Sequence, residues 1–317
     1  MSKIKLRQAY SFCQQGQRAS QEDARYPDCD MPTGSAYLVC DGVGGNACGE
    51  VASRLVADTL GRAAQALGEG ASIDVLRFSR MLCDAYDALA EHATPESRQM
   101  ATTLTFVAFH ADGCFVAYVG DSRVYQLRPG SGIVFRTEDH SLVQELVRSG
   151  QLPPEKAAGH PCSHVITRSL SADGDGRDAA SLVNITDVEA GDYLLLCTDG
   201  VLHRADDATL ERVILAADLT DEEKCRELAR LCEDSTDNNT AILIPVDEVC
   251  CDADAGQDGP AAADESAMQP DAGDGAVVTS PLPRSPIYNN KVIDVAPEPA
   301  GTRLGRLGER IRSWFRA

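Results

Sequence analysis

Hydrophobic and polar residues follow two different patterns along the first 246 residues of the chain. Residues 49–67 and 72–92 carry apolar side chains at intervals of three and four, which predicts two amphipathic helices. The apolar stripes are Val51, Leu55 and Leu60 in the first helix, and Val75, Phe78, Leu82, Tyr86 and Leu89 in the second. Because the two helices follow each other in the sequence, we expect them to pair on one face of a sheet.

Short, continuous apolar runs predict buried strands. Runs of suitable length and composition lie at residues 36–40, 103–109, 114–119, 124–127 and 193–198. The connections at 111–113 and 120–122 are very short. We therefore expect the three strands between 103 and 127 to be antiparallel neighbours.

Two Asp-Gly pairs stand at the ends of such runs. Asp41-Gly42 follows the run at 36–40, and Asp199-Gly200 follows the run at 193–198. An ordinary turn is the alternative interpretation for each pair, since Asp-Gly also occurs in turn-like stretches elsewhere in the chain. A carboxylate at the end of a buried strand is costly unless a cation or hydrogen bonds compensate its charge. With no paired His or Cys nearby, the oxygen ligands favour Mg²⁺ or Mn²⁺ over zinc.

Further motifs occur in a fixed order with these pairs. They are Arg18-x-x-x-Glu22-Asp23, Val39-Cys40-Asp41-Gly42-Val43-Gly44-Gly45, Gly120-Asp121-Ser122-Arg123, Cys197-Thr198-Asp199-Gly200-Val201 and Ser235-Thr236-Asp237-Asn238. In this order they resemble the PPM-type, or type 2C, metal-dependent protein serine/threonine phosphatases, in a bacterial-like short form. The resemblance covers about residues 5–246. It implies an α+β fold, a four-layer α/β/β/α sandwich of two antiparallel sheets flanked by helix pairs, with a flap subdomain at about 138–170.

The resemblance also implies a site. Asp41 would bridge two Mn²⁺ or Mg²⁺ ions, Gly42 would offer its carbonyl to one, and Asp199 and Asp237 would complete the other. Glu22 and Asp23 would hold coordinated waters, Arg18 would bind the phosphate, and Asp121 would join Asp199 in a weaker third metal site. The implied reaction is hydrolysis of phosphoserine and phosphothreonine in proteins by a metal-bridging water attacking in line, opposing a serine/threonine kinase. Many family members have His where this chain has Val43, so the general acid is unassigned.

Two other classes of function compete with an active phosphatase. A pseudophosphatase would bind phosphoprotein without hydrolysis, but every metal-ligand position is filled. An acidic calcium-binding protein would need a contiguous Asp-rich loop with a closing Glu, and the sequence has none.

Composition limits the partners and the cellular location that we expect for this protein. The net charge of -20 argues against nucleic acid as a partner, because a phosphate backbone needs a basic surface. The sequence has no bilayer-spanning run and no secretion signal within its first 12 residues, so we expect a cytoplasmic protein. The twelve cysteines are scattered, with no Cys-x-x-Cys pair, and are expected to be reduced. His160, Cys162 and His164 form a weak candidate for zinc, because Pro161 disrupts the spacing.

The character of the chain changes after Val246. Residues 247–300 hold eleven acidic side chains and few large apolar ones, which predicts an acidic disordered linker. Residues 301–317 predict a basic amphipathic helix whose apolar face is Leu304, Leu307, Ile311, Trp314 and Phe315, with arginines on both flanks. Such a helix suits an anionic membrane surface, which would place the enzyme peripherally at the inner membrane, or a groove in a protein partner.

Overall fold

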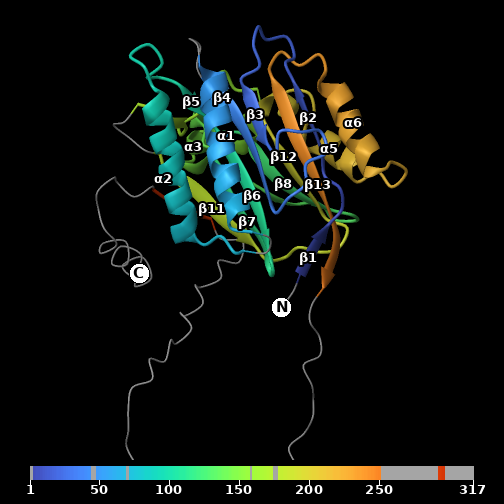
Figure 1. Ribbon diagram of the computed structural model, residues 1–317. Coiled ribbons are helices and arrows are strands. Elements are labelled where there is room, and N and C mark those ends of the chain that lie inside the picture. Colours follow the sequence, from blue (N-terminus) through green and yellow to red (C-terminus); the bar gives the residue numbers. More distant parts are fainter. Residues whose placement is uncertain are drawn as a thin grey trace, which may run out of the picture.

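Two packed antiparallel sheets form the centre of the protein in a computed structural model that describes residues 3–43, 48–68, 71–157, 159–173, 178–250 and 292–296 (Figure 1). The larger sheet has eight strands, seven of them in the order β10 (Leu170–Ser171), β5 (Ala101–Thr102), β4 (Ala36–Val43), β6 (Leu104–His110), β7 (Gly113–Val119), β11 (Ala180–Ile185) and β14 (Ile293–Val295). Its eighth strand, β3 (Asp23–Tyr26), pairs with β4.

The second sheet has six strands, of which five run in the order β1 (Lys3–Leu6), β13 (Asn239–Cys250), β12 (Tyr193–Cys197), β8 (Arg123–Arg128) and β9 (Gly132–Arg136), while β2 (Tyr10–Gln14) pairs with β13. Helices α1 (Gly49–Ala66) and α2 (Val75–His92) lie side by side on the larger sheet, and α5 (Asp207–Ile214) and α6 (Asp221–Cys232) cover the smaller one (Figure 1). The predicted four-layer α/β/β/α sandwich is therefore confirmed.

Three apolar layers hold the sandwich together, and strand β4 shows why its sequence is continuously hydrophobic. Leu38 and Cys40 face the layer beneath α1 and α2, whereas Tyr37 and Val39 face the layer between the two sheets. A strand buried on both faces needs apolar side chains at successive positions. The third layer lies between the smaller sheet and α5 and α6, with Leu195 and Leu243 among its buried residues.

The predicted helices are confirmed with small shifts. The second helix begins at Val75 rather than at residue 72, because the Asp74 side chain caps it by accepting a hydrogen bond from the Arg77 N–H at 2.7 Å. In α1 the fully buried face consists mainly of small residues, such as Ala52 and Ala57, while Val51 and Leu55 are half-buried.

One predicted strand pairing is wrong. Strands β6 and β7 form the expected antiparallel hairpin, but β7 and β8 belong to different sheets. The connection 120–122 crosses from one sheet to the other, starting at Gly120 with φ 98°, in the left-handed region that glycine tolerates. A short connection therefore does not require pairing in a sandwich, and this crossing carries Asp121 to the boundary of the two sheets.

The prediction that residues 247–300 form a disordered linker is wrong at two places. Strand β13 continues to Cys250, because residues 246–250 pair with β1. Residues 293–295 form strand β14 on the edge of the larger sheet. Residues 251–291 and 297–317, including the predicted basic helix, lie outside the described residues, so those expectations remain predictions.

The segment expected to form a flap is ordered around a short helix, α3 (Leu142–Arg148). Ser141 caps it by accepting from the Gln144 N–H at 3.3 Å, and Gly150, with φ 72°, follows its end. A single 3-10 turn, Pro154–Lys156, comes next. Among the described residues, no helix has the length and apolar character needed to cross a membrane.

Candidate metal and phosphate site

A pocket of about 480 Å³ collects most of the predicted site residues. Its carboxylates come from the loop before β3, strand β4, the β7–β8 crossing, the start of α4 (Asp199–Leu202) and the loop before β13. The full lining is Arg18, Ala19, Ser20, Glu22, Asp41, Gly42, Val43, Asp121, His164, Ile166, Asp199, Asp237 and Asn238. Seven of the eight predicted residues thus meet in one place, and Asp23 is the exception.

Asp41 lies within β4, where the strand changes its partner from β6 to β5. Its backbone is fully engaged there. The Asp41 N–H donates to Thr103 Oγ1 at 2.9 Å, and its carbonyl accepts from the Thr103 N–H at 2.8 Å and from Thr102 Oγ1 at 2.9 Å. These bonds fix the direction of the carboxylate, which lines the pocket.

The glycines that follow Asp41 and Asp199 are required by close backbone approaches. A Cβ at Gly42 would lie 2.4 Å from the Gly49 backbone, and a Cβ at Gly200 would lie 1.9 Å from the Asn238 carbonyl oxygen. The Gly200 carbonyl also accepts from Ser235 Oγ at 2.9 Å. The second contact brings the Asp199 and Asp237 segments together, so Asp199-Gly200 is more than a turn at the end of a strand.

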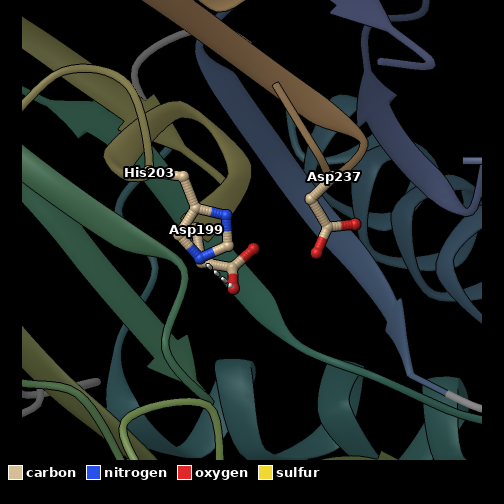
Figure 2. A group of neighbouring side chains, drawn as sticks. All are labelled: Asp199, His203 and Asp237. Carbon is tan, nitrogen blue, oxygen red and sulfur yellow. Dashed lines mark ion pairs between the residues drawn. The ribbon is translucent and has the colours of Figure 1, made fainter. Parts of the chain in front are cut away.

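Figure 2 shows a third side chain beside Asp199 and Asp237, and it belongs to none of the sequence motifs. His203 follows Asp199 by one helical turn, and its Nε2 lies 3.7 Å from Asp199 Oδ2. One possible ligand atom from each of the three residues lies within 4.8 Å of the other two. In the part of the chain that the structure describes, this is the only such group, so the weak zinc candidate at 160–164 has no support. The i, i+4 spacing of Asp199 and His203 is the signal that could have found it.

Burial and mutual repulsion disfavour negative charge in this pocket. Burial, together with neighbouring Asp23 and Asp199, raises the pKa of Asp41 well above its usual range. Burial and then Asp199 raise the pKa of Asp121 to about 8. The Oδ1 atom of Asp199 is buried with no hydrogen-bond partner in the described structure. A set of convergent carboxylate oxygens with an unsatisfied atom fits a hard divalent cation.

Asp23 lies behind the pocket rather than on its wall. It is only 5% exposed, pairs with Asp41 across β3 and β4, and accepts a hydrogen bond from Thr198 Oγ1 at 3.0 Å. Burial raises its pKa to about 7. Its predicted partner Glu22 does line the pocket, so the structure separates two residues that the sequence placed together.

The loop that carries Arg18 is tied to the loop before β13. The Asn238 side chain accepts from the Glu22 N–H at 2.9 Å and donates to the Ser20 carbonyl at 2.9 Å. Arg18 Nη2 lies 2.7 Å from Asp237 Oδ2, and the Arg18 side chain is 57% exposed. A mostly exposed guanidinium is thus held at the mouth of an acidic pocket, where a phosphate group can reach it.

Comparisons with known proteins place the chain in a family. The family model for protein phosphatase 2C matches residues 15–240. The serine/threonine protein phosphatase PstP of Mycobacterium tuberculosis is 32% identical over 244 residues, which cover 77% of this chain and 45% of PstP. The protein phosphatase PhpP of Streptococcus pneumoniae is 31% identical over 219 residues, 67% of this chain and 85% of PhpP. The chain belongs to the protein phosphatase 2C family, although it spans less than half the length of PstP.

Solved structures agree with this assignment. The crystal structure of M. tuberculosis PstP/Ppp superposes with a TM-score of 0.67 at 28% identity, covering 78% of this chain and all of that one. A structure of the PstP catalytic domain in complex with two manganese ions gives a TM-score of 0.65 at 27% identity, with the same coverage of both chains. The resemblance inferred from the five motifs is confirmed.

The raised pKa values predict how the stability of the metal-free protein changes with pH. A carboxyl whose pKa is higher in the folded state stabilises the fold below its unfolded pKa, and that contribution is lost as pH rises through the folded pKa. For Asp23 and Asp121, whose pKa values rise to about 7 and about 8, this window runs from roughly pH 4 to 8. We expect the free energy of unfolding in chelator to fall by at least about 1 kcal/mol between pH 5 and 8.

Urea unfolding monitored by circular dichroism would measure this loss. Saturating Mn²⁺ should remove most of it, because a bound cation favours the ionised carboxylates. The variant Asp121→Asn should show a shallower decline in chelator, since one of the raised groups is gone. Identical pH profiles with chelator and with Mn²⁺ would contradict the assignment of this pocket as a cation site.

Proposed function

We propose that this protein hydrolyses phosphoserine and phosphothreonine in phosphorylated proteins. The observation that carries the proposal is the convergence of Asp41, Asp199 and Asp237 in one pocket with Arg18 at its mouth. Several carboxylates in one pocket would repel a dianionic phosphate unless cations lay between them. Arg18 is suited to bind the phosphate oxygens that such cations do not contact. Membership of the protein phosphatase 2C family supports the same reaction.

Asp41, the Gly42 carbonyl, Asp199 and Asp237 would hold two Mn²⁺ or Mg²⁺ ions, Glu22 and Asp23 would support waters around them, and Asp121 would contribute to a weaker third site. Bound there, the ions supply a water acidic enough to act as a nucleophile at neutral pH. The relative that was solved with two manganese ions supports this number and this metal.

The protein's own side chains bind and orient the phosphate. The ion pair with Asp237 uses Nη2 of Arg18, and a guanidinium has five N–H donors, so others can meet phosphate oxygens. The hydrogen bonds of Asn238 hold the loop that carries Arg18 against the loop that carries Asp237. A phosphate bound by Arg18 would therefore have a fixed position relative to the nucleophile. Val43 cannot donate a proton, so the leaving alcohol must receive one from another group.

Phosphorylated proteins as substrates imply a serine/threonine kinase that acts in the opposite direction. In residues 302–317 the apolar stripe and flanking arginines also support a docking role in the cytoplasm, either on an anionic membrane surface or on a protein. Because strand β14 pairs with β11 of the catalytic domain, residues 297–301 would then link that anchor to the domain.

Metal-dependent hydrolysis tests the central proposal. Purified protein should release phosphate from phosphoserine and phosphothreonine peptides when Mn²⁺ or Mg²⁺ is present, and excess chelator should abolish turnover because the nucleophile depends on the ions. Malachite-green detection of phosphate would measure the rate. Binding of phosphopeptide without any release of phosphate would favour a pseudophosphatase, and full activity in chelator would exclude the metal mechanism.

Two variants separate metal binding from phosphate binding. Asp41→Asn should reduce kcat by at least about 100-fold, because it removes a metal ligand. Arg18→Ala should chiefly raise KM, because it removes a phosphate contact but leaves the carboxylates in place. Near wild-type turnover of Asp41→Asn at saturating metal would show that Asp41 is not a ligand.

His203 provides a test of the metal site that does not depend on activity. If its imidazole joins Asp199 and Asp237 around one ion, His203→Asn should weaken Mn²⁺ binding by at least about tenfold and Mg²⁺ binding less, since imidazole nitrogen prefers the transition metal. Calorimetric titration would measure both affinities. His164→Asn is the matched control, because His164 lines the same pocket from the flap segment. Equal affinities in the two variants would remove His203 from the ligand set.

The proposed docking role of residues 302–317 predicts salt-sensitive binding to anionic vesicles. Each basic side chain near an anionic surface contributes about 1 kcal/mol, and salt screens the attraction. The full-length protein should therefore sediment with phosphatidylserine vesicles at low salt, and Trp314 fluorescence should shift to the blue. Deletion of 302–317 should abolish sedimentation and leave peptide hydrolysis unchanged. Equal sedimentation of both proteins would exclude the membrane role.

A further inference from the structure

Strand β14 is part of the catalytic domain although it lies far outside residues 15–240, the region that matches the family. It pairs antiparallel with β11 on the edge of the larger sheet, with Val295 opposite Ala180, Asp294 opposite Ser181 and Ile293 opposite Leu182. Ile293 and Val295 pack against the apolar layer beneath α1 and α2. An isolated strand of three residues has little stability of its own, so these contacts hold it in place.

Asp294, at the centre of this strand, is bound from two sides. Arg168 donates to both of its carboxylate oxygens, at 2.9 Å from Nη1 and 3.1 Å from Nη2, in the bidentate geometry that favours this pair. Ser181 Oγ donates to Asp294 Oδ1. Arg168 lies two residues after Ile166, which lines the pocket of the metal site. The ion pair therefore ties the C-terminal strand to the end of the flap segment.

A chain of hydrogen bonds, each donated in the same direction, runs from Gly120 beside the pocket to Asp294. His140 Nδ1 accepts from the Gly120 N–H at 3.1 Å, so a neutral ring carries its proton on Nε2. Nε2 lies 2.8 Å from Ser181 Oγ and can donate to it, which leaves the Ser181 hydroxyl proton for Asp294. Burial lowers the pKa of His140 to about 4, which keeps the ring neutral at physiological pH.

His140 forms two hydrogen bonds with Gly120, in the crossing that carries Asp121. Besides accepting from the Gly120 N–H, it donates its own backbone N–H to the Gly120 carbonyl at 2.8 Å. Its carbonyl accepts from the Thr167 N–H of the flap segment at 2.8 Å, and its ring stacks on Tyr118 at 5.0 Å between centroids. Both polar backbone groups of Gly120 thus depend on one buried histidine, whose orientation is set by Ser181 and Asp294.

We propose that residues 292–296 complete the metal site from outside the family domain, with Asp294 as a positioning residue that fixes the Gly120–Asp121 crossing through Ser181 and His140, and the flap segment through Arg168. The effect on metal binding rests on the proposed function, whereas the effect on the order of the crossing does not. The chain would then need its C-terminal strand for full occupancy of the site, even though no residue of that strand touches the pocket.

Hydrogen exchange of the full-length protein tests the proposal without any assay of activity. Asp294→Asn keeps the shape of the side chain but places an amide against Arg168, which should loosen the network. We expect the amide protons of Gly120 and Thr167, whose acceptors are both on His140, to exchange several-fold faster, while those of β12 and β13 stay unchanged. Asp207→Asn is the matched control. Its side chain is similarly exposed, at 44% against 42% for Asp294, and also pairs with an arginine, Arg136 of the smaller sheet.

A second readout is calorimetric titration with Mn²⁺. Affinity of the weakest site should fall about tenfold in Asp294→Asn and stay unchanged in Asp207→Asn, as expected for a residue that orients a ligand without touching the metal. If Asp294→Asn does not fold, Ser181→Ala breaks the same chain and leaves the Arg168 ion pair intact. Exchange rates and Mn²⁺ affinities equal to those of Asp207→Asn would overturn the proposal. The exchange effect in Asp294→Asn, together with an absence of hydrolysis by the wild-type protein, would instead overturn the proposed function alone.

Discussion

Several carboxylates converge in one buried pocket, and the surrounding sheets and loops must hold them together against their mutual repulsion. Burial raises the pKa of Asp41, Asp121 and Asp199, and at least one neighbouring carboxylate adds to the rise at each of them. Such an arrangement opposes folding unless the framework holds it rigidly and a cation compensates it. The same unfavourable arrangement is what gives the site its affinity for divalent metal.

Two sheets supply the rigid framework, and each carboxylate enters the pocket from a different element. Asp41 is fixed within a strand by bonds to Thr102 and Thr103, and Asp199 begins a helix directly after a strand. Because the glycines after these residues allow backbones from different elements to approach, the loops cannot drift apart without losing packed contacts. The pocket is therefore a product of the sandwich as a whole.

Much of this could be predicted from the sequence, for physical reasons that also explain the failures. The helices showed a regular apolar period, and strand β4 showed a continuous apolar run because both of its faces are buried. The crossing at 120–122 was misinterpreted, since a short turn does not reveal whether the next strand joins the same sheet. Strand β14 was missed because its three residues show no periodicity, and only its pairing with β11 and the ion pair of Asp294 make it a strand.

The site residues likewise divide into those whose position a sequence motif predicts and those whose position depends on tertiary packing. Asp41, Asp199 and Asp237 stood out because each belongs to a short motif in a recognisable order, and all three line the pocket. Asp23 belongs to such a motif too, but its burial behind the pocket depends on tertiary packing that a motif does not encode. His203 has no motif of its own. Its closeness to Asp237 arises from the approach of two loops that are distant in the sequence.

A crystal structure of the protein grown with Mn²⁺, with anomalous diffraction recorded at the manganese absorption edge, would show directly whether the pocket binds metal. We expect anomalous peaks inside the pocket, in contact with Asp41, Asp199 and Asp237. A well-ordered pocket without such a peak at millimolar Mn²⁺ would contradict this expectation.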